Sequence, residues 1–136
     1  MRLKRILTLF LLIYSTLSFS QEKSYQLSSH ILDVSLGKPA SLVKIELEKL
    51  NSDKNWVKID ENITDKDGRV KNFLPENNKD NRGIYKLRFY TAEYFNRLNK
   101  TSFYPFIEVV FEIKDNEHYH VPITLSAYGY STYRGS

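Results

Sequence analysis

The chain has 136 residues, no cysteine, 20 lysines and arginines, and 16 acidic residues, which gives a net charge of +4. This length suits one domain, and the lack of cysteine excludes disulfides, thiolate metal ligands and a thiol nucleophile. Residues 1–20 hold three of the basic residues and no acidic one, so that residues 21–136 carry 17 basic and 16 acidic side chains, a balance that gives no basis for binding nucleic acid.

The first segment, residues 1–20, has the layout of a secretory signal peptide. Three basic residues precede an apolar run over 6–14, and mostly small polar residues follow up to position 20. The run is shorter than the roughly 20 residues that a transmembrane helix needs, which favours a cleaved leader over a membrane anchor. We therefore expect export to a periplasm or out of the cell, with residues 21–136 as one domain that has no membrane attachment after cleavage.

Alternation of apolar and polar residues predicts short strands separated by polar turns. In chain order, strands are expected around 30–33, over 42–48, from 56, from 69 after the turn at 65–68, over 83–90, over 106–114 and over 119–125. The one helix is expected over 91–99, with Thr91 as its cap. Tyr94, Phe95 and Leu98 fall at helical spacing. Six to eight strands with one short helix indicate a β-sandwich.

The chain has three histidines, His30, His118 and His120. His118 and His120 are two residues apart on a predicted strand, so they share its face, opposite the apolar side chains of that strand. Three interpretations compete: ordinary surface histidines, a shared zinc ion with further ligands, or general acid–base catalysis, which suits a pKa near neutrality. No acidic residue stands at a spacing that would complete a metal site, and we expect none.

Two other features are candidates for a site. Arg69 follows a tight turn at the start of a strand, where its guanidinium can bind a planar oxyanion or ureide through two hydrogen bonds; a solvated arginine is the ordinary alternative. The last eleven residues, 126–136, contain three tyrosines, which favours a packed tail over a frayed one. Ser136 offers both a hydroxyl and a carboxylate.

Several segments together resemble transthyretin-like proteins. They are Ser29–Asp33 with Gly37–Ala40, Asp65–Arg69, Gly83–Leu87, Tyr94–Phe95, Tyr104–Phe106, His118–Pro122 and Tyr128–Ser136. The resemblance extends from Leu27 to Ser136, and the ending Tyr133-Arg134-Gly135-Ser136 is its most specific part.

The resemblance implies a transthyretin-type β-sandwich of two four-stranded sheets with one short helix, assembled as a homotetramer with active sites in clefts between dimers. By the same resemblance, the catalytic group consists of His30, Arg69, His120 and Ser136. His30, Arg69 and Ser136 are also expected to bind the substrate. The hormone-carrier branch of the family lacks the terminal tetrapeptide and replaces the first histidine and the arginine, so the residues present here favour the hydrolase branch. His118 matches no catalytic position.

The activity that the resemblance implies is hydrolysis of 5-hydroxyisourate to 2-oxo-4-hydroxy-4-carboxy-5-ureidoimidazoline in urate breakdown, with no cofactor and no metal. His120 or His30 is expected to deprotonate water, and the residues leave open which of them does so. Arg69 is expected to stabilise the developing oxyanion, and Ser136 to orient water or a histidine. The alternatives are a non-enzymatic transthyretin-like protein that binds a small molecule, and a structural or carbohydrate-associated module.

Overall fold

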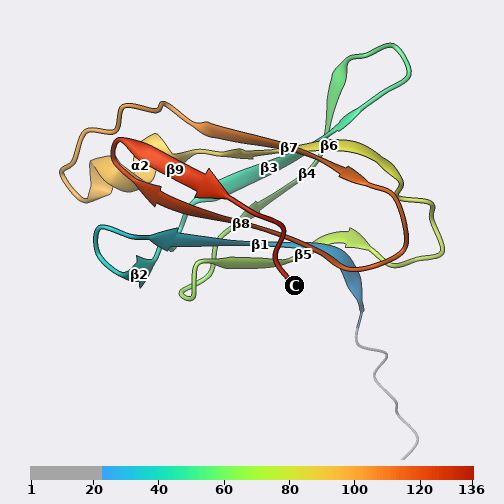
Figure 1. Cartoon of the computed structure of the whole chain (residues 1–136), viewed down its shortest axis with the longest axis horizontal. Helices are drawn as coiled ribbons and strands as arrows, with labels where there is room; N and C mark the ends of the chain where they lie inside the picture. Colours follow the sequence, from blue (N-terminus) through green and yellow to red (C-terminus); the bar gives the residue numbers. More distant parts are fainter. Residues whose placement is uncertain (1–22) are drawn as a thin grey trace, which may run out of the picture.

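A computed structural model describes residues 23–136, which form two packed β-sheets with one short helix at an end (Figure 1). The expected signal peptide, residues 1–20, lies outside the described residues. The elements are β1 Tyr25–Asp33, β2 Lys38–Pro39, β3 Lys44–Leu50, β4 Trp56–Ile63, β5 Arg69–Pro75, β6 Gly83–Phe89, α2 Thr91–Arg97, β7 Ile107–Ile113, β8 Tyr119–Ser126 and β9 Gly129–Thr132. Among the described residues, no helix combines the length and the apolar character needed to cross a membrane.

The first sheet is four strands wide, although five strands contribute to it. Residues 25–30 of β1 pair with β5, and residues 32–33 pair with β2, so these two strands share one edge of β1. Strand β8 runs parallel to β1 along the other edge, and β9 pairs with β8. The second sheet has the order β4-β3-β6-β7 and is antiparallel throughout. The β-sandwich expected from the sequence is confirmed.

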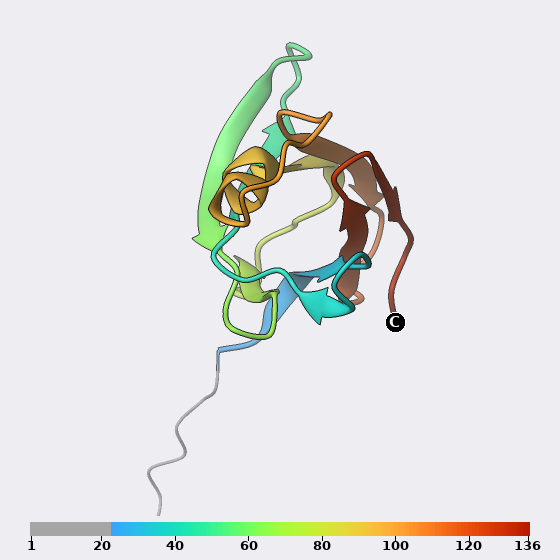
Figure 2. The same ribbon diagram turned by 90° about the vertical axis from the view of Figure 1, so that its left-hand side faces the viewer.

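The core lies between the two sheets, which Figure 2 shows in end view. Alternate residues of each strand point into it, as the pleat of a strand requires. The fully buried aliphatic and aromatic residues include Leu27, Ile31, Ile45, Leu47, Leu87, Phe89, Ile123 and Leu125. Burying one such side chain contributes roughly 1.5–3 kcal/mol, and a shift of one residue in any strand would expose its whole apolar set. The core therefore fixes which side chains of each strand face outward.

Helix α2 covers one end of the sandwich (Figure 2). Tyr94 and Phe95 are buried, as their spacing predicts, whereas Leu98 lies beyond the last helical residue and is 37% exposed. The helix begins at Thr91 as expected but ends at Arg97, two residues before the expected end, and the prediction that Thr91 caps it is wrong, because Thr91 is already its first helical residue. Tyr90 occupies the N-cap position, and the Thr91 hydroxyl is buried without a hydrogen-bond partner.

The buried carboxylate of Asp33 ties this helix to the sheet. Its Oδ1 accepts the backbone N–H groups of Ser35 at 2.9 Å and Leu36 at 3.1 Å, which closes the turn after β1. Its Oδ2 accepts the Tyr94 hydroxyl at 2.9 Å. Burial, together with this hydrogen bond, raises the pKa of Tyr94 to about 12. The end of β1 and the helix therefore hold each other in place.

Candidate functional site

Two histidines and an arginine from three strands lie on the outer face of the first sheet. His30 stands directly opposite Arg69 in the pairing of β1 with β5, and Ser28 stands opposite His120 in the pairing of β1 with β8. Because both neighbours of His30 in the chain are buried, its own side chain points outward. His120 is half-buried between buried neighbours in β8. The prediction that His118 and His120 face away from the core is confirmed.

Arg69 is positioned by the turn that precedes β5. The Asp65 carboxylate accepts the backbone N–H groups of Asp67 and Arg69, each at 2.9 Å, and these bonds lower the pKa of Asp65. Gly68 has φ +69°, and a β-carbon on it would lie 2.6 Å from the carbonyl oxygen of Ile31. Glycine is therefore required there, both for its positive φ and for this close approach. The turn is held against β1 next to His30.

The surroundings of His30 and His120 favour the neutral form of each imidazole. Burial, and then the positive charge of Arg69, lower the pKa of His30 and the pKa of His120. His30 and His118 lower the pKa of His120 further, since a second positive charge nearby would be repelled. A neutral imidazole can accept a proton at pH 7, which is what a general base requires.

Sequence analysis missed Ser28, which joins two of the three histidines. Its Oγ lies 2.8 Å from Nε2 of His118 and 2.8 Å from Nδ1 of His120. The other ring nitrogen of His118, Nδ1, lies 2.9 Å from the backbone carbonyl of Tyr25. The available signal was that Ser28 stands two residues before His30 and thus shares its face of β1. Its partner strand could not be known, because Ser28 and His120 are 92 positions apart.

The C-terminal tail folds back onto His120, which confirms the prediction of an ordered tail, although the three tyrosines on which that prediction rested are exposed. After β9, the N–H of Gly135 donates to the carbonyl of His120 at 2.9 Å. The Arg134 guanidinium lies over the ring of Tyr119, 4.8 Å from its centroid. Ser136 follows Gly135 and is exposed. Its expected role toward water or a histidine stays a prediction.

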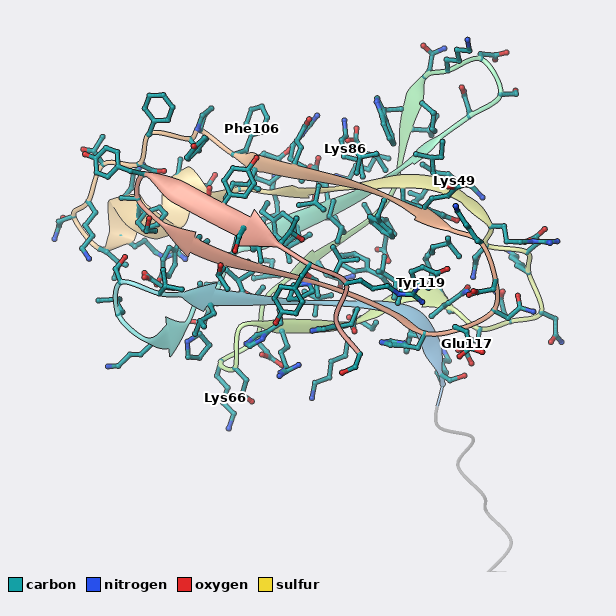
Figure 3. The ribbon with its side chains drawn as sticks, viewed as in Figure 1. Lys49, Lys66, Lys86, Phe106, Glu117 and Tyr119 are labelled. Atoms are coloured by element: carbon teal, nitrogen blue, oxygen red, sulfur yellow. The ribbon has the colours of Figure 1, made fainter. Side chains whose placement is uncertain are left out.

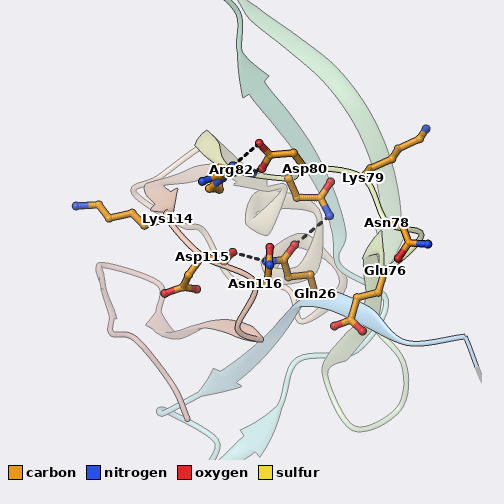
Figure 4. Close-up of a pocket in the computed structure, with 10 residues that line it drawn as sticks. Gln26, Glu76, Asn78, Lys79, Asp80, Arg82, Lys114, Asp115 and Asn116 are labelled. Carbon is orange, nitrogen blue, oxygen red and sulfur yellow. Dashed lines mark hydrogen bonds and ion pairs between the residues drawn. The ribbon is translucent and has the colours of Figure 1, made fainter.

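A separate cavity lies away from these histidines, between loops at one end of the sandwich (Figure 4). It measures about 750 Å³ and is lined by Gln26, Glu76, Asn78, Lys79, Asp80, Asn81, Arg82, Lys114, Asp115 and Asn116. Arg82 is paired with Asp80 at 2.9 Å, and the Gln26 amide bonds the Asp115 carbonyl and the Asn81 side chain. Several of its polar groups thus satisfy one another, and no histidine lines it.

The histidine face, in contrast, combines groups that complement each other chemically. A neutral imidazole can remove a proton from water, and a guanidinium opposite it can stabilise a developing oxyanion. Within residues 23–136, no three histidine, cysteine or acidic side chains are grouped as a metal ion would require. His118 and His120 instead share the hydroxyl of Ser28. Of the interpretations of the histidines, the arrangement favours acid–base chemistry.

Comparisons with known proteins identify relatives over most of the chain. The sequence matches the HIUase/Transthyretin family over residues 27–135. A 5-hydroxyisourate hydrolase of Salmonella dublin is 49% identical over 111 residues, which cover 81% of this chain and 80% of that protein. The structure of Klebsiella pneumoniae 5-hydroxyisourate hydrolase superposes with a TM-score of 0.69 at 31% identity, covering 85% of this chain and all of that one.

A protein that binds a small molecule shares the same fold. The structure of sea bream transthyretin in complex with thyroxine gives a TM-score of 0.76 at 29% identity, covering 81% of this chain and 94% of that one. Since a hydrolase and a thyroxine-binding protein both superpose well, the fold alone does not choose between the two functions. The choice rests on the side chains of the site.

Proposed function

The chain belongs to the HIUase/Transthyretin family, and we propose that it hydrolyses 5-hydroxyisourate to 2-oxo-4-hydroxy-4-carboxy-5-ureidoimidazoline in urate breakdown. The observation that carries the proposal is the convergence of His30, Arg69 and His120 on one face of the sheet, with Gly135 of the tail against His120. The Salmonella dublin hydrolase, at 49% identity, supports the assignment.

The reaction begins with a water molecule between the substrate and an imidazole. His120 is the base we favour, because its Nδ1 is bonded to Ser28 and its pKa lies below the ordinary value. As its Nε2 takes a proton from water, the oxygen forms a bond to a carbonyl carbon of the six-membered ring. A positioned general base contributes roughly 10²–10⁴-fold to the rate.

The attack places a negative charge on the former carbonyl oxygen. Arg69 can donate two parallel hydrogen bonds to this oxygen and to a neighbouring one of the substrate. The C–N bond of the ring then breaks, the nitrogen receives the proton that the imidazole took, and the new carboxylic acid releases its own proton to the solvent to give a carboxylate. His30, directly opposite Arg69, is placed to bind the substrate or to hand over this proton. Ser136 would orient water or an imidazole from the tail.

A non-enzymatic binding protein is the competing assignment. Binding a planar ligand would need a complementary surface and the arginine, but it would not need two imidazoles with lowered pKa values beside that arginine. Perturbed titratable groups that converge on one face are more typical of catalysis. This difference favours the hydrolase.

The decisive test follows the ultraviolet absorbance of freshly prepared 5-hydroxyisourate. The substrate decays unaided, so the decay rate with the purified protein is compared with the rate in buffer. We expect a clear acceleration that is lost in His120→Asn and in Arg69→Gln, and kept in Asp53→Asn, an exposed residue of the turn before β4. Binding of the substrate without faster decay would support the binding protein instead.

We also propose that the protein is a homotetramer whose active sites lie in clefts between dimers. Within the described residues, β7 and β9 are the outer strands of their sheets on one side, and both line a cleft of about 250 Å³. Exposed apolar side chains lie on these strands or directly next to their ends, among them Phe106, Val110, Tyr130 and Tyr133. Edge strands with apolar side chains are typical sites for pairing with a second copy. Light scattering after gel filtration should give four times the mass of the chain.

Finally, we propose that residues 1–20 direct export and are removed. The basic start and the short apolar run support this. N-terminal sequencing of the protein recovered from the periplasm or the medium should begin at Gln21. A protein found in the cytoplasm with Met1 or Arg2 at its start would contradict export.

A further inference from the structure

We propose that His118 and Ser28 are positioning residues that hold His120 as the tautomer protonated on Nδ1, so that Nε2 keeps the lone pair that accepts the proton of water. The catalytic meaning of this inference rests on the proposed hydrolase activity. The tautomer itself is a property of the protein and can be measured without any substrate.

The first step of the argument is the contact between Tyr25 and His118. A backbone carbonyl can only accept a hydrogen bond. Because Nδ1 of His118 lies 2.9 Å from the carbonyl oxygen of Tyr25, that nitrogen must carry the proton. When His118 is neutral, only one of its ring nitrogens is protonated, so its Nε2 then has a lone pair and is an acceptor.

The second step passes through the hydroxyl of Ser28. Its oxygen lies 2.8 Å from the acceptor Nε2 of His118, so the single hydroxyl proton is donated there. The same oxygen lies 2.8 Å from Nδ1 of His120 and has only lone pairs left for that contact. Nδ1 of His120 must therefore be the donor. Its second nitrogen, Nε2, is left unprotonated as the base.

The ring of His120 is also fixed in orientation. Ser28 bonds its Nδ1, and Gly135 lies so close to Cδ2 that a β-carbon on this glycine would overlap it. A half-turn of the ring would put a C–H group against the Ser28 oxygen and lose the hydrogen bond. A second-layer partner that fixes the tautomer and the orientation of a catalytic imidazole is the role that the aspartate has in serine proteases. Here a serine and an exposed histidine supply it.

This arrangement explains a feature that the catalytic group alone leaves unexplained. His118 is exposed and stands outside the group expected to touch the substrate, yet both of its ring nitrogens have partners at hydrogen-bond distance. An exposed side chain loses conformational entropy when it is held in this way. Holding His120 in one tautomer is a function that accounts for the ordered side chain of His118.

The direct test is ¹⁵N nuclear magnetic resonance of the histidine rings of the purified protein, at a pH well above the ordinary imidazole pKa of about 6.5, where we expect His118 and His120 both to be neutral. We expect a pyrrole-type shift for Nδ1 of His120 and a pyridine-type shift for Nε2. In Ser28→Ala the two shifts should approach each other, as both tautomers become populated, and Ser28→Thr should restore the original pattern. The matched control is Ser29→Ala, because the Ser29 hydroxyl is buried, faces the core and donates to the Val121 carbonyl at 2.8 Å. Its loss should lower the stability of the protein but leave the ¹⁵N shifts of the His120 ring unchanged.

The kinetic test compares Ser28→Ala, His118→Ala and the double variant. Each single change should lower kcat by roughly 10- to 100-fold, within the contribution of a positioned base, with little change in KM. Because both residues belong to one hydrogen-bonded chain, the double variant should be no slower than the slower single variant. The exposed position of His118 makes its replacement compatible with folding.

Two results would overturn the proposal: a proton on Nε2 of His120 in the unaltered protein, or a Ser28→Ala variant with an unchanged ¹⁵N pattern. If either result is found and the protein still accelerates the decay of 5-hydroxyisourate, the proposed hydrolase activity stands and the positioning roles of Ser28 and His118 are wrong. If the tautomer pattern is as expected but the protein does not accelerate the decay of 5-hydroxyisourate, the positioning of His120 stands and the proposed substrate is wrong.

Discussion

The backbone of Gly135 lies directly against the imidazole of His120. Its N–H donates to the His120 carbonyl at 2.9 Å, and a β-carbon at this position would overlap Cδ2 of the ring and lie 3.1 Å from Cγ. The tail therefore contacts the proposed base through a residue that has no side chain. The tetrapeptide that carries the most specific resemblance belongs to the site by physical contact.

Replacing Gly135 by alanine should lower kcat/KM by at least about tenfold, since a displacement of about 1 Å at a catalytic group can cost 10²-fold. Either the His120 ring or the tail must move to admit the methyl group. The measurement is the decay of 5-hydroxyisourate at several concentrations. Gly129→Ala is the matched control, because a β-carbon there meets only the Ser126 hydroxyl at 3.8 Å. Equal activity of both variants would show that the contact at Gly135 has no influence on the base.

Replacing Arg69 by glutamine should shift the titration of His120 to higher pH. Burial contributes most to the lowered pKa of His120, and the charge of Arg69 comes next. Without that charge the pKa rises toward its ordinary value near 6.5 but stays below it. The base then becomes protonated at a higher pH as the solution is acidified. Following the His120 ring proton by nuclear magnetic resonance against pH measures the shift, and a shift to lower pH would contradict the electrostatic assignment.

Replacing Tyr94 by phenylalanine should lower the free energy of unfolding by roughly 1.5–3 kcal/mol, the contribution of a hydrogen bond to a charged group. The partner lost is the buried carboxylate of Asp33, 2.9 Å from the hydroxyl. Urea denaturation at pH 7 measures the difference, and kcat should stay close to that of the unaltered protein. Unchanged stability would indicate that water replaces the hydroxyl.

The same variant should also change how stability depends on alkaline pH. The pKa of Tyr94 is about 12 in the folded protein and about 10 when unfolded. The folded state thus holds its proton longer, and this part of the stability is present below pH 10 and is lost as the pH rises through 12. Phenylalanine has no such proton, so the stability difference between the two proteins should narrow over that interval.

Replacing Lys86 by methionine should destabilise the second sheet by up to about 3 kcal/mol, because the buried Glu48 carboxylate loses its nearer partner and keeps only Arg88, at 3.6 Å. Lys86 is 5% exposed, with Nζ 2.7 Å from Glu48, and it lies on the outer side of that sheet (Figure 3). Adding Glu48→Gln should recover much of the loss, which urea denaturation of the three variants measures. Turnover per folded molecule should not change, because the catalytic face belongs to the other sheet.

Local sequence pattern determined much of this protein. Alternation in 119–125 placed the apolar side chains inward and His118 and His120 outward, and the Asp65–Gly68 signal placed the turn before Arg69. A pattern of period two is a property of the strand itself, because the pleat alternates its side chains whatever strand lies beside it. Helix α2 was also evident, although its first turn begins at Thr91 instead of being capped by that residue.

Only the tertiary structure decided which strands are neighbours. The parallel pairing of β1 with β8 brings Ser28 to His120 across 92 positions, and the fold-back of the tail sets Gly135 on the same ring. Alternation encodes the face of a side chain but carries no information about its partner across the sheet. That partner follows from the register that buries the whole core at once. The residues expected to react could therefore be named from the sequence, whereas those that hold them in position became visible only in the folded chain.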